Sequence, residues 1–150
     1  MSNRVPYEAT LKVRDTCLCL HAQRAARALA RRFDDALRPC GLSNGQFSLL
    51  MALNRPEPAK PAPVAALLAM DRTTLTAALK PLERDGLVTI ETDPQDRRGR
   101  LLRLTERGHA VLLSALPIWQ EVHAAIEAGI ETGLPGLEPD SLRAAMNALR

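Results

Sequence analysis

The sequence predicts a mainly α-helical protein with one small β-hairpin, an α+β fold dominated by its helices. Leucine and alanine are prominent among the 46% of residues that are hydrophobic, whereas aromatic residues make up only 3%. Leucine and alanine lose little conformational freedom in a helix, so this composition favours helices. Two β-like runs, residues 87–92 and 101–105, flank a polar, turn-forming segment at 93–100 and predict the hairpin.

The first element expected is one long helix over residues 11–38. Apolar residues recur there at helical spacing: Leu18, Ala22, Ala25, Leu29 and Phe33. Pro39 and Gly41 are expected to end this helix. Because the apolar stripe is thin and rich in alanine, the helix needs a partner to be stable.

Two short helices are expected next. Ser43 and Gln46 fit a capping box at the start of the first. The segment 56–63 contains four prolines and is expected to be a loop. It leads into a second short helix over 64–70, which has no Ser, Thr, Asp or Asn at its start to cap it.

The fourth predicted helix has two distinct faces. Asp71 is expected to cap it, and Gly86 is expected to end it. One face carries apolar residues at helical spacing and is expected to be buried: Leu75, Ala78, Leu79 and Leu82. The opposite face carries small or polar residues: Thr73, Thr74, Thr76, Ala77 and Lys80.

The last third of the chain is expected to be helical. Thr105 is a candidate cap for a long helical region over 106–130, and the glycines at 133–136 separate it from a last amphipathic helix. Leu142, Ala145, Met146 and Leu149 form the apolar stripe of that helix. This stripe and that of the first helix would both be covered if the terminal helices paired with a second copy, which predicts a homodimer.

Positive charge is concentrated in two segments. The net charge is only +3, yet residues 97–107 contain five arginines and one acid, and residues 11–38 contain seven basic and three acidic side chains. Residues 109–150 contain five acids and two arginines. A basic strip beside an acidic tail favours a localised contact with a polyanion, although residues 11–38 could simply be a solvated face.

Two short helices, an exposed small-polar helix face and a basic hairpin, in this order, predict a winged helix-turn-helix. A helix fits the major groove of duplex DNA, where short polar side chains can reach base edges. An arginine-rich loop can enter the neighbouring minor groove, where the potential is most negative. The sequence therefore predicts that the chain binds double-stranded DNA, and a dimer predicts a pseudo-palindromic operator.

The sequence also resembles the multiple-antibiotic-resistance regulator (MarR) family over nearly its whole length. The resemblance is sharpest in DRTTLTAALKPLERDGLV (71–88) and in DPQDRRGR (93–100) followed by LTERG (104–108). It implies one domain over residues 1–150, with dimerisation helices at 11–40 and 109–150 and the winged helix-turn-helix at 42–108. It further implies a sequence-specific transcription regulator, expected to be a repressor relieved by a small ligand.

The resemblance also implies roles for particular residues. DNA contacts are expected from Arg72, Thr73, Thr74, Thr76, Ala77 and Lys80 in the helix, and from Arg97, Arg98 and Arg100 in the wing. Asp71, Asp96 and Arg98 are expected to anchor the wing, with Asp71 and Arg98 in one polar network.

Cys19 is a candidate redox residue, because it lies 22 residues before Gly41, a spacing that resembles the peroxide-sensing branch of this family. A small buried cysteine is the alternative. Cys17 and His21 are a weak metal-ligand pair, and neither a metal nor another cofactor is expected.

Other classes of function fit the sequence less well. A winged helix that binds proteins without binding DNA is the main alternative, and the arginine-rich hairpin argues against it. An enzyme is not expected, because the cysteines and histidines lie in no catalytic motif. No stretch of about 18 apolar residues is present, so a soluble cytoplasmic protein without a membrane contact is expected.

Overall fold

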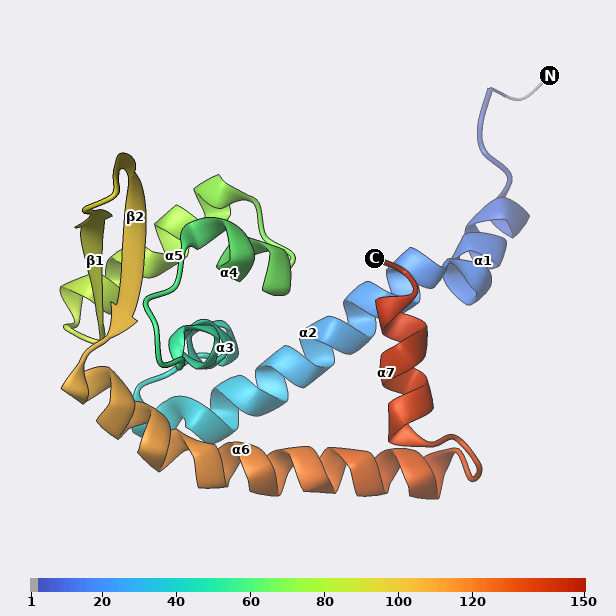
Figure 1. Ribbon diagram of the computed structural model, residues 1–150. Helices are drawn as coiled ribbons and strands as arrows, with labels where there is room; N and C mark the ends of the chain where they lie inside the picture. Colours follow the sequence, from blue (N-terminus) through green and yellow to red (C-terminus); the bar gives the residue numbers. More distant parts are fainter. Residues whose placement is uncertain (1–2) are drawn as a thin grey trace.

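The computed structural model describes residues 3–150 and confirms a mainly helical fold with one two-stranded sheet (Figure 1). The elements are α1 (Tyr7–Thr16), α2 (Leu18–Leu37), the 3-10 turn η1 (Arg38–Cys40), α3 (Asn44–Leu53), α4 (Pro61–Leu67), α5 (Arg72–Arg84), β1 (Val88–Asp93), β2 (Asp96–Leu104), α6 (Glu106–Gly133) and α7 (Pro139–Asn147). Helices α3, α4 and α5 lie beside the hairpin, the long helices α2 and α6 extend away from it, and α1 and α7 lie at the far end.

The prediction of one helix over residues 11–38 is wrong, because the chain leaves helical geometry at Cys17, where φ is −70° and ψ is 109°. Thr16 donates its hydroxyl to the carbonyl of Lys12 at 2.7 Å, a local bond that competes with a straight continuation. The Cys17 thiol then accepts from the Leu20 amide at 3.4 Å and caps α2. No residue of α1 is buried, so no packing within the chain favours an unbroken helix.

The predicted caps are confirmed. Ser43 and Gln46 form the complete capping box of α3. The Asp71 carboxylate accepts from the Thr74 amide at 2.6 Å, and the Thr105 hydroxyl accepts from the Gly108 amide at 3.0 Å. Gly86 follows α5 with a left-handed φ of 73°. Helix α4 begins without a side-chain cap, as its sequence indicates, but it spans Pro61–Leu67 rather than 64–70, because proline is tolerated in the first turn of a helix.

The hairpin is longer than its sequence predicts. Residues 96–100 were expected in the loop but belong to β2, so Pro94 and Gln95 alone separate the two strands. The strands pair antiparallel from Val88 opposite Leu104 to Thr92 opposite Arg100, and the register shifts between Thr92 and Asp93. Pairing between the strands extends them into a segment whose residue types favour turns, because the backbone hydrogen bonds of a hairpin do not depend on side-chain polarity.

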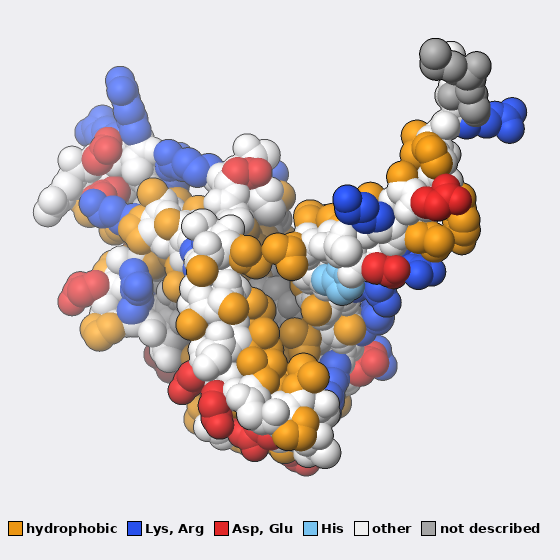
Figure 2. All heavy atoms as spheres, turned by 90° about the vertical axis from the view of Figure 1, so that its right-hand side faces the viewer, with side chains coloured by type: hydrophobic (Ala, Val, Ile, Leu, Met, Phe, Trp, Pro, Cys, Tyr) orange, Lys and Arg blue, Asp and Glu red, His pale blue; other side chains and the backbone are white. Residues whose placement is uncertain are grey.

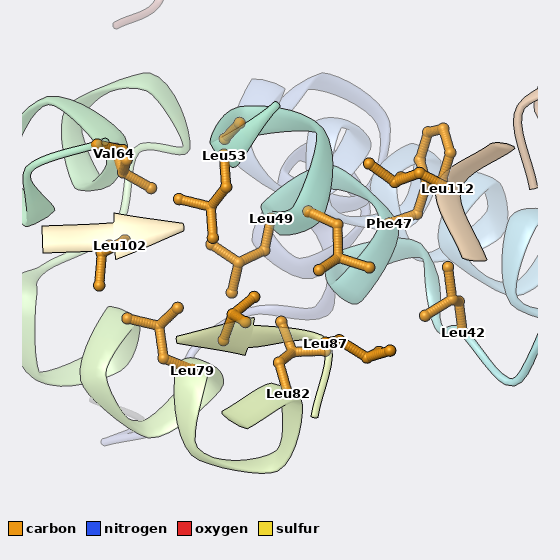
Figure 3. Close-up of a cluster of buried hydrophobic side chains, with 14 of the residues drawn as sticks. Leu42, Phe47, Leu49, Leu53, Val64, Leu79, Leu82, Leu87, Leu102 and Leu112 are labelled. Carbon is orange, nitrogen blue, oxygen red and sulfur yellow. The ribbon is translucent and has the colours of Figure 1, made fainter. Parts of the chain in front are cut away.

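The core joins the hairpin to the helices around α3 (Figure 3). Leu49 and Leu53 of α3 lie near Leu79 of α5 and Leu102 of β2. Leu49, Leu75, Leu82 and Leu102 are all at most 1% exposed. The apolar face predicted for α5 therefore holds that helix against α3 and the sheet, and its other face is left to solvent.

The terminal helices are covered little by the rest of the chain. Helix α1 extends away from the hairpin, and neither α1 nor α7 contains a buried residue (Figure 1). Large apolar side chains remain exposed in and beside these helices: Val13 of α1 at 57%, Met146 of α7 at 49%, Leu18 at the start of α2 at 72% and Leu149 after α7 at 67%. Between residues 3 and 150, none of the helices combines the length and apolar character needed to cross a bilayer.

Candidate nucleic-acid interface

Helix α5 presents a small, polar and cationic face to solvent. All the residues predicted to contact DNA from this helix are exposed: Arg72, Thr73, Thr74, Thr76, Ala77 and Lys80. The side chains of Arg72 and Lys80 form no hydrogen bond or ion pair within residues 3–150. Thr76 is exposed and donates its hydroxyl to the Arg72 carbonyl at 2.8 Å, so its oxygen lone pairs remain available as acceptors. This face can offer a hydrogen-bond acceptor and two positive charges to a partner.

The turn of the hairpin is ordered by two aspartates and a glycine. Asp93 is only 8% exposed, and its carboxylate accepts from the Gln95 amide at 2.9 Å. The Asp96 carboxylate accepts from the Arg98 amide at 3.0 Å. A Cβ at Gly99 would lie 3.2 Å from the Asp96 carbonyl and 3.3 Å from the Asp93 Cβ, so glycine fits this turn closely. The roles of Asp93 and Gly99 were not predicted, although Asp-Pro is a common start of a turn.

The three arginines predicted for the wing differ in their contacts. Arg97 and Arg98 are exposed, and no described residue between 3 and 150 pairs with either guanidinium. Arg100 instead donates to the Gly99 carbonyl at 3.1 Å and to the Arg97 carbonyl at 3.4 Å, so it folds back on the turn. Arg97 and Arg98 are therefore free to meet an anion, whereas Arg100 helps to shape the loop that carries them.

Charge is unevenly distributed over the molecule (Figure 2). Lys and Arg side chains gather at the upper left and along the arm on the right, with some acids among them, whereas Asp and Glu gather along the lower edge. The acids of residues 109–150 contribute to this lower edge, since α6 lies there. Such a distribution directs the upper end of the molecule toward a polyanion.

The structure does not join Asp71 to Arg98. Asp71 bonds at the first turn of α5, Arg98 bonds through its backbone to Asp96, and no ion pair connects Asp71 with Arg98 in the described part of the chain. The Thr74 amide satisfies the Asp71 carboxylate locally, so the network implied by the family resemblance is not formed in this chain alone. A link between the two residues in the presence of DNA stays a prediction.

Asp71→Ala should lower the Tm by a few degrees, because it removes the cap of α5. Hydrogen bonds from the Thr74 amide and hydroxyl keep the pKa of Asp71 below its ordinary value of 3.8. The cap therefore stabilises the fold fully above pH 3.8, and this contribution is lost as the pH falls through the lowered pKa. In thermal melts of both proteins between pH 3 and 7, the difference in Tm should narrow toward the acid end.

Asp71→Asn is the matched control for this cap. It keeps an oxygen acceptor but does not titrate, so it should stay close to the original Tm at neutral pH. A constant gap between the parent protein and Asp71→Ala down to pH 3 would contradict the capping role of the ionised carboxylate.

Two hollows beside Trp119, the only tryptophan, lie where α3 packs against the long helices α2 and α6. The Trp119 ring stacks on His123 with centroids 4.6 Å apart and lies 6.1 Å from the Phe47 ring. Trp119 and Phe47 line two hollows of about 330 and 280 Å³. The sequence could not identify Phe47 on α3 as the neighbour of Trp119 on α6, because the two residues are far apart in the chain.

The described structure does not bring the cysteines and His21 together into a redox or metal site. The exposed Cys19 thiol accepts from the Gln23 side-chain amide at 3.2 Å, so a redox role stays a hypothesis. The His21 ring bonds to the Cys17 carbonyl rather than to its thiol, at 2.8 Å. Across residues 3–150, no three His, Cys, Asp or Glu side chains are grouped so that they could hold a metal.

Comparisons with known proteins agree with the arrangement of α5 and the hairpin. The model of the MarR family matches residues 42–99. The chain is 32% identical over 114 residues to the transcriptional repressor MprA of Escherichia coli, covering 75% of this chain and 61% of MprA. It is 39% identical over 74 residues to the transcriptional activatory protein BadR of Rhodopseudomonas palustris, covering 47% of this chain and 42% of BadR. The chain thus spans less than two thirds of the length of these two relatives.

A solved structure matches over more of the chain. The M. tuberculosis transcriptional regulator MosR in complex with DNA is 37% identical, with a TM-score of 0.76 over 89% of this chain and 93% of MosR. The match extends beyond the winged part, since it includes most of the chain. With its match to the family model and this degree of identity, the chain belongs to the MarR family.

Proposed function

We propose that this chain is a sequence-specific DNA-binding transcription regulator of the cytoplasm rather than an enzyme. The observation that carries the proposal is the pairing of an exposed cationic face on α5 with a wing whose Arg97 and Arg98 are free of partners in residues 3–150. These two surfaces suit the major groove and the adjacent minor groove of one duplex. The likeness to MosR, which was solved with DNA, supports the same conclusion.

A salt-dependent DNA titration tests the proposal. Operator candidates are first selected from a random duplex pool, and their affinity is then measured by fluorescence anisotropy between 50 and about 300 mM salt. The logarithm of the affinity should fall linearly with the logarithm of salt, and the selected site should bind more tightly than a random duplex. A winged helix that binds only proteins predicts no enrichment and no measurable slope.

Thr76→Val and Lys80→Ala should change which sequences are preferred. The oxygen lone pairs of Thr76 can accept from the amino group of cytosine or adenine, and valine keeps the shape but removes this acceptor. Each change is expected to cost about 1–3 kcal/mol on the selected site and less on a random duplex. Repeating the selection with each variant checks this, and an unchanged consensus for both would contradict base contacts from α5.

The regulator is proposed to act as a homodimer on a pseudo-palindromic operator. Residues 11–40 and 109–150 supply the dimerisation helices, and residues 42–108 supply the winged helix-turn-helix. The uncovered apolar side chains of α1 and α7 support this assignment, because burying them needs a second copy. The two copies of α5 in the dimer then contact two DNA half-sites about 34 Å apart.

Leu18→Glu should convert the dimer to a monomer. Leu18 is 72% exposed within one chain, so the new charge costs a single chain little but is costly in an apolar interface. Sedimentation velocity at micromolar concentration should give a dimer for the parent protein and a smaller species for the variant. A monomeric parent with one chain per DNA site would exclude the dimer.

The proposed outcome of binding is repression that a small ligand relieves. The hollow beside Trp119 supports an apolar or aromatic ligand, because most of its lining is apolar: Phe47, Met51, Ala52, Leu67, Leu116 and Trp119. Since Trp119 is the only tryptophan, quenching of its fluorescence reports binding at the hollows that this residue lines. A relieving ligand should quench Trp119 and lower the affinity for DNA over the same concentration range, and quenching without lower affinity would argue against relief.

A further inference from the structure

A small hollow of about 140 Å³ lies at the base of the hairpin. The loop between α3 and α4 contributes Arg55 and Glu57, β2 contributes Arg103 and Leu104, and the start of α6 contributes His109. It shares none of its lining residues with the hollows beside Trp119. It also contains none of the residues predicted to contact DNA.

The side chains of this hollow carry more positive than negative charge. Arg55 and His109 have no side-chain hydrogen bond or ion pair to any residue from 3 to 150. Within the same residues, the Arg103 side chain has one interaction, an exposed, long ion pair with Glu91 at 3.8 Å. Glu57 is the single carboxylate of the lining, so the two arginines outnumber it without counting His109.

The backbone of β2 adds a donor to the same place. Ala59 exchanges two hydrogen bonds with Leu102, at 2.9 and 2.8 Å, on the edge of β2 that faces away from β1. Alternate residues of a strand direct their N–H groups to the same edge, so Leu104 directs its N–H to this edge as well. Ala59 with Leu102 is the one bridge outside the hairpin in residues 3–150, so this edge is open at Leu104.

We propose that this hollow binds the phosphate group of a free phosphate ion or of the DNA backbone. A guanidinium offers paired N–H donors that match two phosphate oxygens, and an imidazole and a backbone N–H can serve the others. The volume suits a compact oxyanion, since a water molecule takes about 30 Å³ in the liquid. The bound group would connect the α3–α4 loop, the wing and α6.

The test is an NMR titration of the full chain, without DNA, with sodium phosphate while sodium chloride holds the ionic strength constant. Saturable shifts are expected at the amides of Arg55, Leu104 and His109. Arg55→Gln should weaken phosphate binding at least about tenfold, because it removes a charged donor. Glu57→Gln should tighten binding, and Arg32→Gln, a charge change on exposed α2, should leave it unchanged.

A second arm distinguishes the two sources of phosphate. If only duplex DNA shifts the amides of the hollow, and Arg55→Gln lowers the salt slope of DNA binding by about 0.9 per chain, the group is a backbone phosphate and the proposal stands. If neither phosphate nor DNA shifts these amides, or if Arg32→Gln weakens binding as much as Arg55→Gln does, the hollow is not a specific phosphate site and the proposal is overturned. Binding of free phosphate does not depend on recognition of an operator. The phosphate titration therefore succeeds or fails independently of the proposed function.

Discussion

Arg98→Ala is expected to weaken binding to every duplex, selected or random, by about ten- to a hundredfold. A charge-assisted hydrogen bond contributes about 1.5–3 kcal/mol, and nothing within the described chain competes with DNA for this guanidinium. The slope of log affinity against log salt should also fall by about 0.9 for each phosphate contact that is lost. Because the wing meets phosphates or groove shape, the preferred sequence should stay the same.

The control for Arg98 is Arg32→Ala, which removes the same charge from the exposed surface of α2. It should leave affinity and slope close to those of the parent protein. Arg100→Ala is a useful third variant, since Arg100 bonds to the carbonyls of Gly99 and Arg97 and should act through the shape of the turn. Unchanged affinity and slope for Arg98→Ala would show that the hairpin does not contact DNA.

Gly108→Ala is expected to destabilise the fold by about 3 kcal/mol or more, since inserted atoms in a packed site commonly cost 1–3 kcal/mol when the neighbours can shift. Here the neighbour is backbone: a Cβ at Gly108 would lie 2.2 Å from the Leu87 carbonyl oxygen and 3.2 Å from its carbon. The same carbonyl accepts from the Thr105 amide at 3.1 Å, so it cannot move away without losing that bond. The substitution should therefore displace the start of α6 from the hairpin.

Gly129→Ala, in the same helix, is the matched control. A Cβ there meets nothing within 4 Å, and alanine should stabilise α6 by about 1 kcal/mol through helix propensity. Urea unfolding of both variants measures the two effects, and DNA affinity of folded Gly108→Ala reports the altered position of the wing. Equal stability of the two variants would contradict the close approach of α6 to Leu87.

The structural features that can be predicted from the sequence alone are local ones. The capping box of Ser43 and Gln46, the cap at Asp71 and the left-handed Gly86 all follow from bonds or torsions within a few residues. The two faces of α5 were predictable for the same reason, because helical spacing assigns each side chain to one face. Hence the solvent-facing residues of α5 and the arginines of the hairpin can be predicted from the sequence alone.

The way in which distant segments meet depends on the tertiary fold. The break at Cys17 persists because the described chain buries no residue of α1, and the longer hairpin exists because β1 offers partners to residues 96–100. The hollow at Leu104 depends on Ala59, which bridges Leu102 and leaves the next part of the edge open. Backbone pairing and close packing between remote residues carry no local side-chain pattern, so the sequence could not reveal them.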